Sequence, residues 1–384
     1  MDFAIPAEVT EALEQFKDFL GTHMESHLAE WYKQEAIPRE FFQEMGHDGW
    51  LGYSQEDSQV TEQPALKQAV LLENLAKIAP GVAVAVLVQI SLGMAPLFLF
   101  GSEEQKRKHL VSAVNGETLL CLGNTEHKAG SDVASIAMQA EQVEGGWVLN
   151  GTKAYVTNGA ISDLALLTAV TDPEASRNHR LSMFLVDLSS TGVSRKKLNK
   201  QVWIPSDLTR LSFDNVFVPE EDLVGERGRG LQQVLATFTH SRIPISGLTL
   251  GTAVGAFEMG LDRAKKREIF GRKIMDFQAK AFEIAEFSTR LEAARLIVWK
   301  AAWAKDEGRN FRMEASMAKY LTVEIAREVG VWAADLFGAA SVMQEHPVHK
   351  YPMDAWASSL GEGTQDVQKL IVFREVMKKI VGRG

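Results

Sequence analysis

The spacing of hydrophobic residues changes twice along the chain, and this order constrains the fold more than any other feature. From about residue 7 to 116, apolar side chains recur at helical spacing, as in Phe16 and Leu20. From about residue 119 to 225, short β-rich runs alternate with turn residues, and long helical patterns then continue to the C-terminus. Such segregated runs favour separate helical and β units over a doubly wound sheet.

We therefore predict an α+β protein with three domains. These are an N-terminal helical domain over 1–117, a central small β-barrel or sandwich over 118–228, and a C-terminal helical domain over 229–384. In the third domain Gly247, Gly251 and Gly255 recur every four residues. They form a smooth ridge on one helix, against which a neighbouring helix can pack closely.

Two dipeptides in the β-rich region, Gly145-Gly146 and Asn150-Gly151, predict hairpin turns, because tight primed turns need positive φ. The chain contains neither GxGxxG nor GxxxxGK[ST], so a Rossmann or P-loop nucleotide site has no support. It also lacks a nucleophile elbow.

Residues 78–100 carry no charge and are long enough to cross a bilayer. Pro80 and Pro96 interrupt this stretch, and Pro96 is expected to break a helix near its middle or end. A helix buried in a soluble core therefore explains it better, and we expect no membrane span. The acidic, amphipathic N-terminus lacks a signal-peptide core, and the single Cys121 fits a reducing compartment, so we expect a cytoplasmic protein.

The net charge of −9 argues against a nucleic-acid partner, since such proteins usually carry a basic surface. His346 and His349 are not accompanied by the carboxylates that would complete a metal site, so no metal is expected.

Three local segments can carry chemistry, and each also has an ordinary structural explanation. The loop TEHKAGSD from Thr125 to Asp132 offers hydroxyl and backbone donors to a phosphate or a heterocycle, but a surface loop has the same composition. The segment REIFGR from Arg267 to Arg272 offers arginines suited to pyrophosphate, or forms a solvated helix end.

The third segment is Gly361-Glu362-Gly363-Thr364, which precedes an amphipathic run that Thr364 can cap. Its two glycines let the backbone approach a ligand closely. The Glu362 carboxylate there can act as a general base, or it can merely complement the dipole of the helix.

Taken together and in order, six segments resemble the acyl-CoA dehydrogenase family over essentially the whole chain. They are FGSEEQKRKHL, TEHKAGSDV, NGTKAYVTNG, REIFGRKIMDFQ, AWAKDEGR with EASMAKY, and HPVHKYPMDAWASSLGEGTQDVQKLIV. The resemblance implies an N-terminal helical domain, a central β-domain and a C-terminal helical bundle over 229–384 that resembles a four-helix bundle. It also implies FAD bound between the last two domains and across a subunit interface, hence a homodimer or homotetramer.

The resemblance implies cofactor roles for residues that match the family's motifs. Thr125 and Thr157 look like contacts to the flavin ring, Ser131 looks like a contact to the FAD pyrophosphate, and Tyr155 stands where the family usually has a tryptophan against the flavin.

Four further matches concern the outer parts of the cofactor site. Arg267 and Phe270 resemble the pair that reaches the FAD of the neighbouring subunit. Gly338 resembles part of a glycine motif near the adenine, and Thr364 a cofactor contact beside the catalytic segment.

Glu362 resembles the family's catalytic base, with Arg242, Gly361 and Gly363 on the substrate side. Some relatives place that glutamate at the position of Ser241 instead. The implied reaction transfers the α-proton to Glu362 and a hydride from the β-carbon to flavin N5. The backbone N–H of the glutamate and a flavin ribityl hydroxyl stabilise the enolate, and the electrons pass to an electron-transfer flavoprotein or another acceptor.

Several positions depart from the family's common pattern. They are His127, Lys128, Thr239, Ala339, Met353, Gly361 and Asp366. Thr239 and Met353 leave open an acyl-carrier protein in place of free CoA, and Gly361 is expected to widen the pocket around the acyl group. The departures also keep one alternative open, namely a catalytically silent family member that serves as a binding or assembly subunit.

Overall fold

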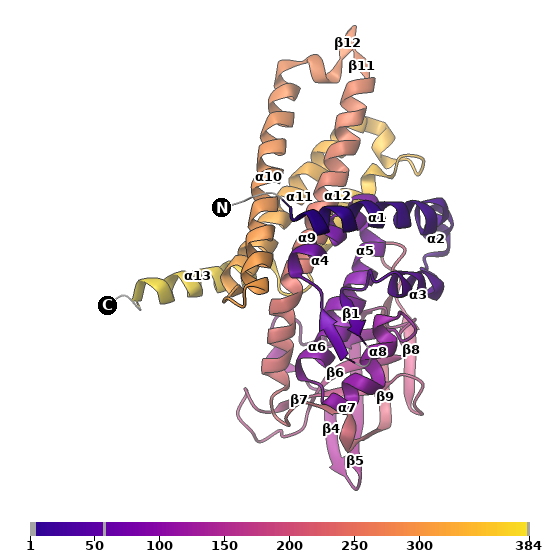
Figure 1. Ribbon diagram of the computed structural model, residues 1–384, viewed down its shortest axis with the longest axis vertical. Helices are drawn as coiled ribbons and strands as arrows, with labels where there is room; N and C mark the ends of the chain where they lie inside the picture. Colours follow the sequence, from indigo (N-terminus) through magenta and orange to yellow (C-terminus); the bar gives the residue numbers. More distant parts are fainter. Residues whose placement is uncertain (1–4, 57–58, 382–384) are drawn as a thin grey trace.

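The computed structural model describes residues 5–56 and 59–381, which form two helical regions with a β-sheet region between them in sequence (Figure 1). The first helical region contains α1 (Ala7–His23), α2 (Leu28–Gln34), α3 (Arg39–His47), α4 (Ala65–Ile78), α5 (Pro80–Leu87), α6 (Ala95–Phe100), α7 (Glu103–Gln105) and α8 (Val111–Val114), with a small hairpin of β1 (Tyr53–Glu56) and β2 (Gln59–Glu62). The expected α+β fold is confirmed.

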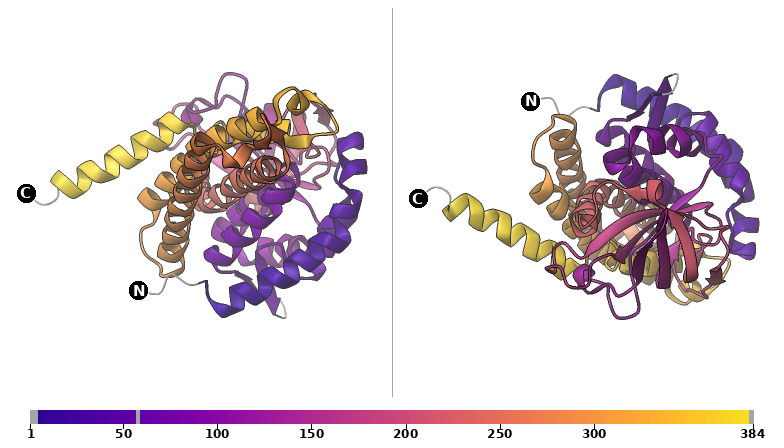
Figure 2. Two further views of the ribbon diagram at one scale, coloured as in Figure 1. Left: turned by 90° about the horizontal axis from the view of Figure 1, so that it is seen from above. Right: turned by 90° about the horizontal axis from the view of Figure 1, so that it is seen from below.

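The central region is one eight-stranded sheet with the order β10-β7-β6-β4-β5-β9-β8, in which β3 also pairs with β6. The strands are β3 (Leu120–Gly123), β4 (Gln139–Val143), β5 (Gly146–Thr157), β6 (Leu164–Val170), β7 (Leu181–Asp187), β8 (Val193–Lys197), β9 (Leu208–Pro219) and β10 (Leu223–Val224). Seen from below in Figure 2, the sheet curves around one end of the long helices.

The C-terminal region contains α9 (Gly230–Lys266), α10 (Gln278–Asp306), α11 (Arg312–Phe337), α12 (Lys350–Ala357) and α13 (Gln365–Val381). A hairpin of β11 (Glu268–Ile269) and β12 (Arg272–Lys273) joins α9 to α10 at the end of the molecule far from the sheet (Figure 1). Helix α13 projects away from the body of the chain (Figures 1 and 2).

The glycine ridge on α9 lies against α4, as the four-residue spacing predicts. A methyl group on Gly247, Gly251 or Gly255 would overlap the carbonyl oxygen of Ala69, Glu73 or Lys77, respectively. The two backbones therefore approach more closely than any side chain would allow.

Of the two predicted hairpin turns, only one is correct. Gly145 has positive φ and links β4 to β5, which pair in antiparallel fashion. Asn150-Gly151 instead lies inside β5, where the pairing with β9 shifts register between Leu149 and Gly151. Glycine there serves a β-bulge, which needs the same backbone freedom as a turn.

The prediction that Pro96 breaks its helix was wrong. The helical path runs from Pro80 to Phe100, and a π-helical segment, η2 (Val88–Met94), precedes α6 at the proline. The wider turn accommodates a residue that cannot donate a backbone hydrogen bond. This stretch is apolar enough to cross a membrane, but 83% of its most apolar window is buried inside the protein.

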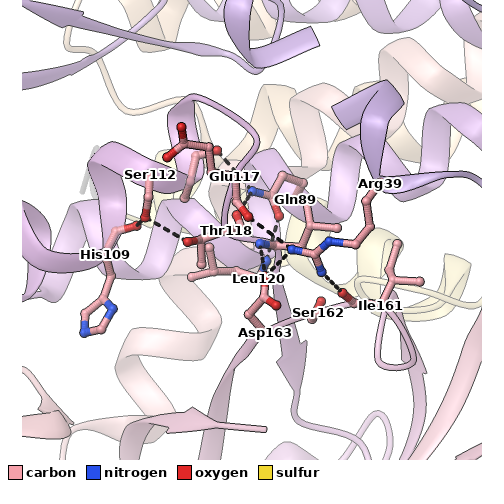
Figure 3. Close-up of polar contacts among 12 residues, drawn as sticks. Arg39, Gln89, His109, Ser112, Glu117, Thr118, Leu120, Ile161, Ser162 and Asp163 are labelled. Atoms are coloured by element: carbon pink, nitrogen blue, oxygen red, sulfur yellow. Dashed lines mark hydrogen bonds and ion pairs between the residues drawn. The ribbon is translucent and has the colours of Figure 1, made fainter. Parts of the chain in front are cut away.

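A polar seam joins the N-terminal helices to the sheet (Figure 3). The Arg39 guanidinium donates to the carbonyl of Ile161 at 2.6 Å and to the carboxylate of Asp163 at 2.7 Å. The buried amide of Gln89, in η2, donates to the carbonyl of Thr118 at 3.0 Å and accepts from the N–H of Leu120 at 2.7 Å. The seam thereby fixes the π-helical segment against the start of β3.

Candidate active site

A cavity of about 410 Å³ lies where the three regions meet. The N-terminal helices contribute an apolar wall that includes Val84, Val88 and Leu92, two of which belong to η2. Residues of the sheet and its loops form a second wall, and α9 and the loop before α13 form a third. The cavity is mostly apolar with a few polar groups, as is typical of ligand sites.

The polar groups of the second wall include the residues predicted to face a flavin. Thr125 follows β3, and Tyr155 and Thr157 lie at the end of β5; all three line the cavity. The N–H of Ala154 donates to the carbonyl of Thr125 at 2.8 Å, which joins the two segments. Among residues 5–56 and 59–381, neither threonine hydroxyl has a hydrogen-bond partner, so both are available to the polar edge of a heterocycle such as the flavin.

Glu362 also lines this cavity, from the loop between α12 and α13. Its φ is +56°, a left-handed conformation that non-glycine residues rarely adopt. The Ser241 hydroxyl, on α9, donates to the carboxylate at 2.5 Å. Burial raises the pKa of Glu362 to about 7, although Ser241, Lys319 and Arg242 act in the opposite direction.

Two buried cations stand near this carboxylate. Arg242 follows Ser241 on α9, donates to the hydroxyl of Thr239 at 3.2 Å, and has its pKa lowered to about 10 by burial. Lys319, on α11, is fully buried and donates to the carbonyls of Gly361 and Gly363. Lys319 was not predicted as a site residue, although it lies in the EASMAKY segment.

A tryptophan in an unusual conformation forms part of the cavity wall. Trp203 has a φ of +54°, and its N–H donates to the carboxylate of Asp354, on α12, at 2.6 Å. Its carbonyl accepts from the ammonium group of Lys200 at 2.5 Å. Burial raises the pKa of Asp354 to about 7. These contacts fix the left-handed backbone of Trp203 beside the cavity.

The remaining predicted residues lie outside the cavity lining. Ser131 is exposed on the loop after Thr125, and Gly338 is exposed just beyond α11. Arg267 and Phe270 lie at the β11–β12 hairpin, where the Phe270 side chain is 95% exposed. Thr364 is partly buried, and its carbonyl accepts from the N–H of Gln368 at 3.0 Å. Within one chain, therefore, only some of the predicted cofactor-binding residues line the cavity.

Family models for the three parts of one enzyme family match the chain in order. The N-terminal domain of acyl-CoA dehydrogenase matches residues 6–117, the middle domain 121–216 and the C-terminal domain 228–377. This chain belongs to the acyl-CoA dehydrogenase family.

Individual relatives agree with the family models over nearly the full length. A short-chain specific acyl-CoA dehydrogenase from Clostridium acetobutylicum is 31% identical over 98% of this chain and 100% of its own. An acyl-CoA dehydrogenase from Bacillus subtilis is 33% identical over 90% of this chain and 91% of its own. The solved structure of butyryl-CoA dehydrogenase from Megasphaera elsdenii superposes with a TM-score of 0.92 at 30% identity, covering 98% and 100% of the two chains.

Proposed function

We propose that this acyl-CoA dehydrogenase oxidises the α,β carbon–carbon bond of an acyl thioester, with Glu362 as the base that removes the α-proton. The observation that carries the proposal is that Glu362, whose pKa burial raises to about 7, lines the same cavity as Thr125 and Thr157. A general base is most effective when its pKa lies near the working pH.

FAD is the cofactor of the enzyme. The hydroxyls of Thr125 and Thr157, which have no hydrogen-bond partner among the described residues, suit its flavin ring. Solved structures of a relative, PigA, contain FAD, and PigA is 27% identical to this chain. When bound, the flavin supplies the acceptor for the hydride that leaves the β-carbon. Tyr155 lines the same cavity, and Ser131 and Thr364 extend the proposed cofactor contacts.

The chain itself supplies the proton chemistry. The Glu362 carboxylate takes the α-proton, and the apolar wall around Val88 and Leu92 excludes water that would otherwise solvate the carboxylate. Removal of this proton places negative charge on the thioester oxygen. A backbone N–H directed at that oxygen lowers the barrier, as in other oxyanion sites.

We propose CoA as the carrier of the acyl group and an electron-transfer flavoprotein as the electron acceptor. A relative from Acetobacterium woodii, 34% identical over 82% of this chain, is named as a subunit of a caffeyl-CoA reductase–Etf complex. An acyl-carrier protein is the alternative to CoA, because Thr239 and Met353 depart from the family pattern. Comparing matched CoA and carrier-protein thioesters by flavin bleaching separates the two carriers.

Replacing Glu362 with Gln tests the role of the base. The variant keeps the size and most hydrogen bonds of the side chain but cannot accept the proton. We expect FAD and thioester still to bind, and single-turnover flavin reduction to slow by about 10²- to 10⁴-fold. Glu362→Asp should retain part of the rate, because it draws the base back by one methylene. Reduction of the Gln variant within a few-fold of wild type would assign the base to another residue.

A further inference from the structure

The loop that carries Glu362 is held by two buried side chains from neighbouring helices. The ammonium group of Lys319 donates to the carbonyls of Gly361 and Gly363, at 2.5 Å each. The amide of Gln368, on α13, donates to the carbonyls of Glu362 and Gly363 at 3.1 and 3.0 Å. Three successive carbonyls therefore point toward α11 or α13.

The direction of one of these carbonyls determines the direction of an N–H group. In a trans peptide the C=O and the N–H are coplanar and point in opposite directions. Because the Gly361 carbonyl points at Lys319, the N–H of Glu362 points away from Lys319. Among the residues that the structure describes, this N–H has no hydrogen-bond acceptor, and Gly361 and Glu362 both line the cavity.

We propose that Lys319 is a positioning residue that polarises the Glu362 N–H toward the thioester oxygen of the substrate. The inference rests on the proposed dehydrogenation, in which this N–H stabilises the developing enolate. An ammonium ion bound to a carbonyl draws electron density through the amide and makes its N–H a stronger donor, and hydrogen bonds in series reinforce one another. The ammonium ion lies in a fully buried site, where its charge acts through a low dielectric.

The same contacts stabilise the left-handed backbone of Glu362. Positive φ at a residue with a side chain costs free energy, and it persists only where the surrounding structure imposes it. Gln368 shares the Gly363 carbonyl with Lys319, but it carries no charge, and its amide donates to the carbonyls of Glu362 and Gly363 rather than to that of Gly361. Gln368 therefore provides a matched control that loosens the loop without removing the polarising charge.

The direct test measures the carbonyl of a bound ligand. The probe is the trans-2-enoyl-CoA product of the best substrate, labelled with ¹³C at the thioester carbonyl, bound to the oxidised enzyme and observed by difference infrared spectroscopy. We expect a downward shift of the carbonyl stretch in wild type, which Lys319→Met reduces by at least half. Gln368→Leu should leave most of the shift, and Lys319→Gln, which keeps a donor without the charge, should give an intermediate value.

Kinetics provide the second readout. Loss of a whole oxyanion donor slows catalysis by about 10²- to 10³-fold, so weakening one donor in Lys319→Met should slow flavin reduction by roughly 10- to 100-fold. The affinity for the enoyl-CoA should change only a few-fold. The pH midpoint of flavin reduction should rise in Lys319→Met, because Lys319 lowers the pKa of Glu362, and should not rise in Gln368→Leu.

Two results would overturn the inference. One is a Lys319→Met enzyme with the carbonyl shift and pH midpoint of wild type. The other is failure of both Lys319→Met and Lys319→Gln to fold and bind FAD, which would make the lysine purely structural. A wild-type enzyme whose flavin no acyl thioester reduces would instead contradict the proposed function. The infrared comparison would then use a labelled trans-2-enoyl-CoA chosen by its binding to the oxidised enzyme, and would still report on Lys319.

Discussion

At the scale of single residues, the proposed role of Glu362 as a base sets two opposing requirements. The side chain must be poorly solvated to be a strong base, and it must be ionised to be a base at all. Burial raises its pKa to about 7, and the hydrogen bond from Ser241 counteracts part of that rise. The rate of flavin reduction should therefore increase as the pH rises through about 7, because the ionised form is the reactive one.

Ser241→Ala tests this balance. Without the hydroxyl, the charged form of Glu362 loses a donor, so the pH midpoint of flavin reduction should rise by about one pH unit, the equivalent of one charge-assisted hydrogen bond. Ser246→Ala is the control, because Ser246 is also buried on α9 but its hydroxyl donates to the carbonyl of Arg242 and, within the described part of the chain, to no carboxylate. Equal midpoints in the two variants would show that Ser241 does not tune the base.

Substitutions at Gly361 test the prediction that this glycine widens the pocket around the acyl group. Space is open around the position of its missing Cβ, and its φ lies outside the left-handed range, so a side chain fits without strain. Gly361→Leu should reduce kcat/KM for branched or cyclic acyl groups by at least about tenfold more than for short straight chains, a difference of roughly 1.4 kcal/mol. Gly361→Ala serves as the smaller control. Equal losses on both classes of thioester would contradict a role in acyl selectivity.

The sequence predicted some site residues and missed others for a physical reason. Glu362 could be singled out because glycines flank it and because the segment Gly361-Glu362-Gly363-Thr364 resembles the catalytic segment of the family. Lys319 does not, because a single lysine in a helix usually faces solvent, and only the packing of α11 against the loop shows that it is buried. Ser241 was noted as the place where a rival base is absent, and its contact with the carboxylate became visible only in three dimensions.

At the scale of helices and strands, close packing of α9 on α4 offers the clearest stability prediction. Gly251→Ala should destabilise the fold by about 1–3 kcal/mol or more, because the methyl group would overlap the carbonyl oxygen of Glu73 and both backbones would have to shift. Gly21→Ala, in α1, meets no atom within 4 Å and should stabilise by about 0.5–1 kcal/mol. Denaturant unfolding of both variants measures the contrast, and similar stabilities would refute the packing argument.

The order of helices and strands was readable from the sequence because hydrophobic spacing reports it directly. Local breakers were harder to interpret. Pro96 and Gly151 were read as a helix break and a turn, but the structure uses them in a π-helical path and a β-bulge. The backbone conformation of Pro96 suits a helix break and a π-helical path alike, and that of Gly151 suits a turn and a β-bulge alike. The helix or strand around each residue decides which of the two forms.

At the scale of the whole molecule, the exposed hairpin and the projecting α13 leave apolar side chains uncovered. Phe270 is 95% exposed, and Phe373 on α13 is 60% exposed. We predict a homodimer or a tetramer built from dimers, in which Arg267 and Phe270 complete the neighbour's FAD site and Gly338 lies near the adenine. Light scattering of the FAD-loaded protein at micromolar concentration checks this, and a loaded monomer would contradict it.

Phe270→Ser should then lower FAD occupancy or weaken the assembly. Val143→Ser, which alters a 38% exposed residue of β4, is the control and should change neither. A Phe270 variant that keeps the wild-type FAD content and mass would place the hairpin outside the cofactor site.

The construction of the cavity affects how the substrate preference of this chain can evolve. Its walls come from η2, from the sheet loops and from the segment before α13, so no single region encloses the reacting carbons. A substitution in one wall alters a volume whose shape the other two also define. Selection for a new acyl group therefore acts on distant stretches of the gene together, and substrate preference becomes an inherited property of the whole chain rather than of any one motif.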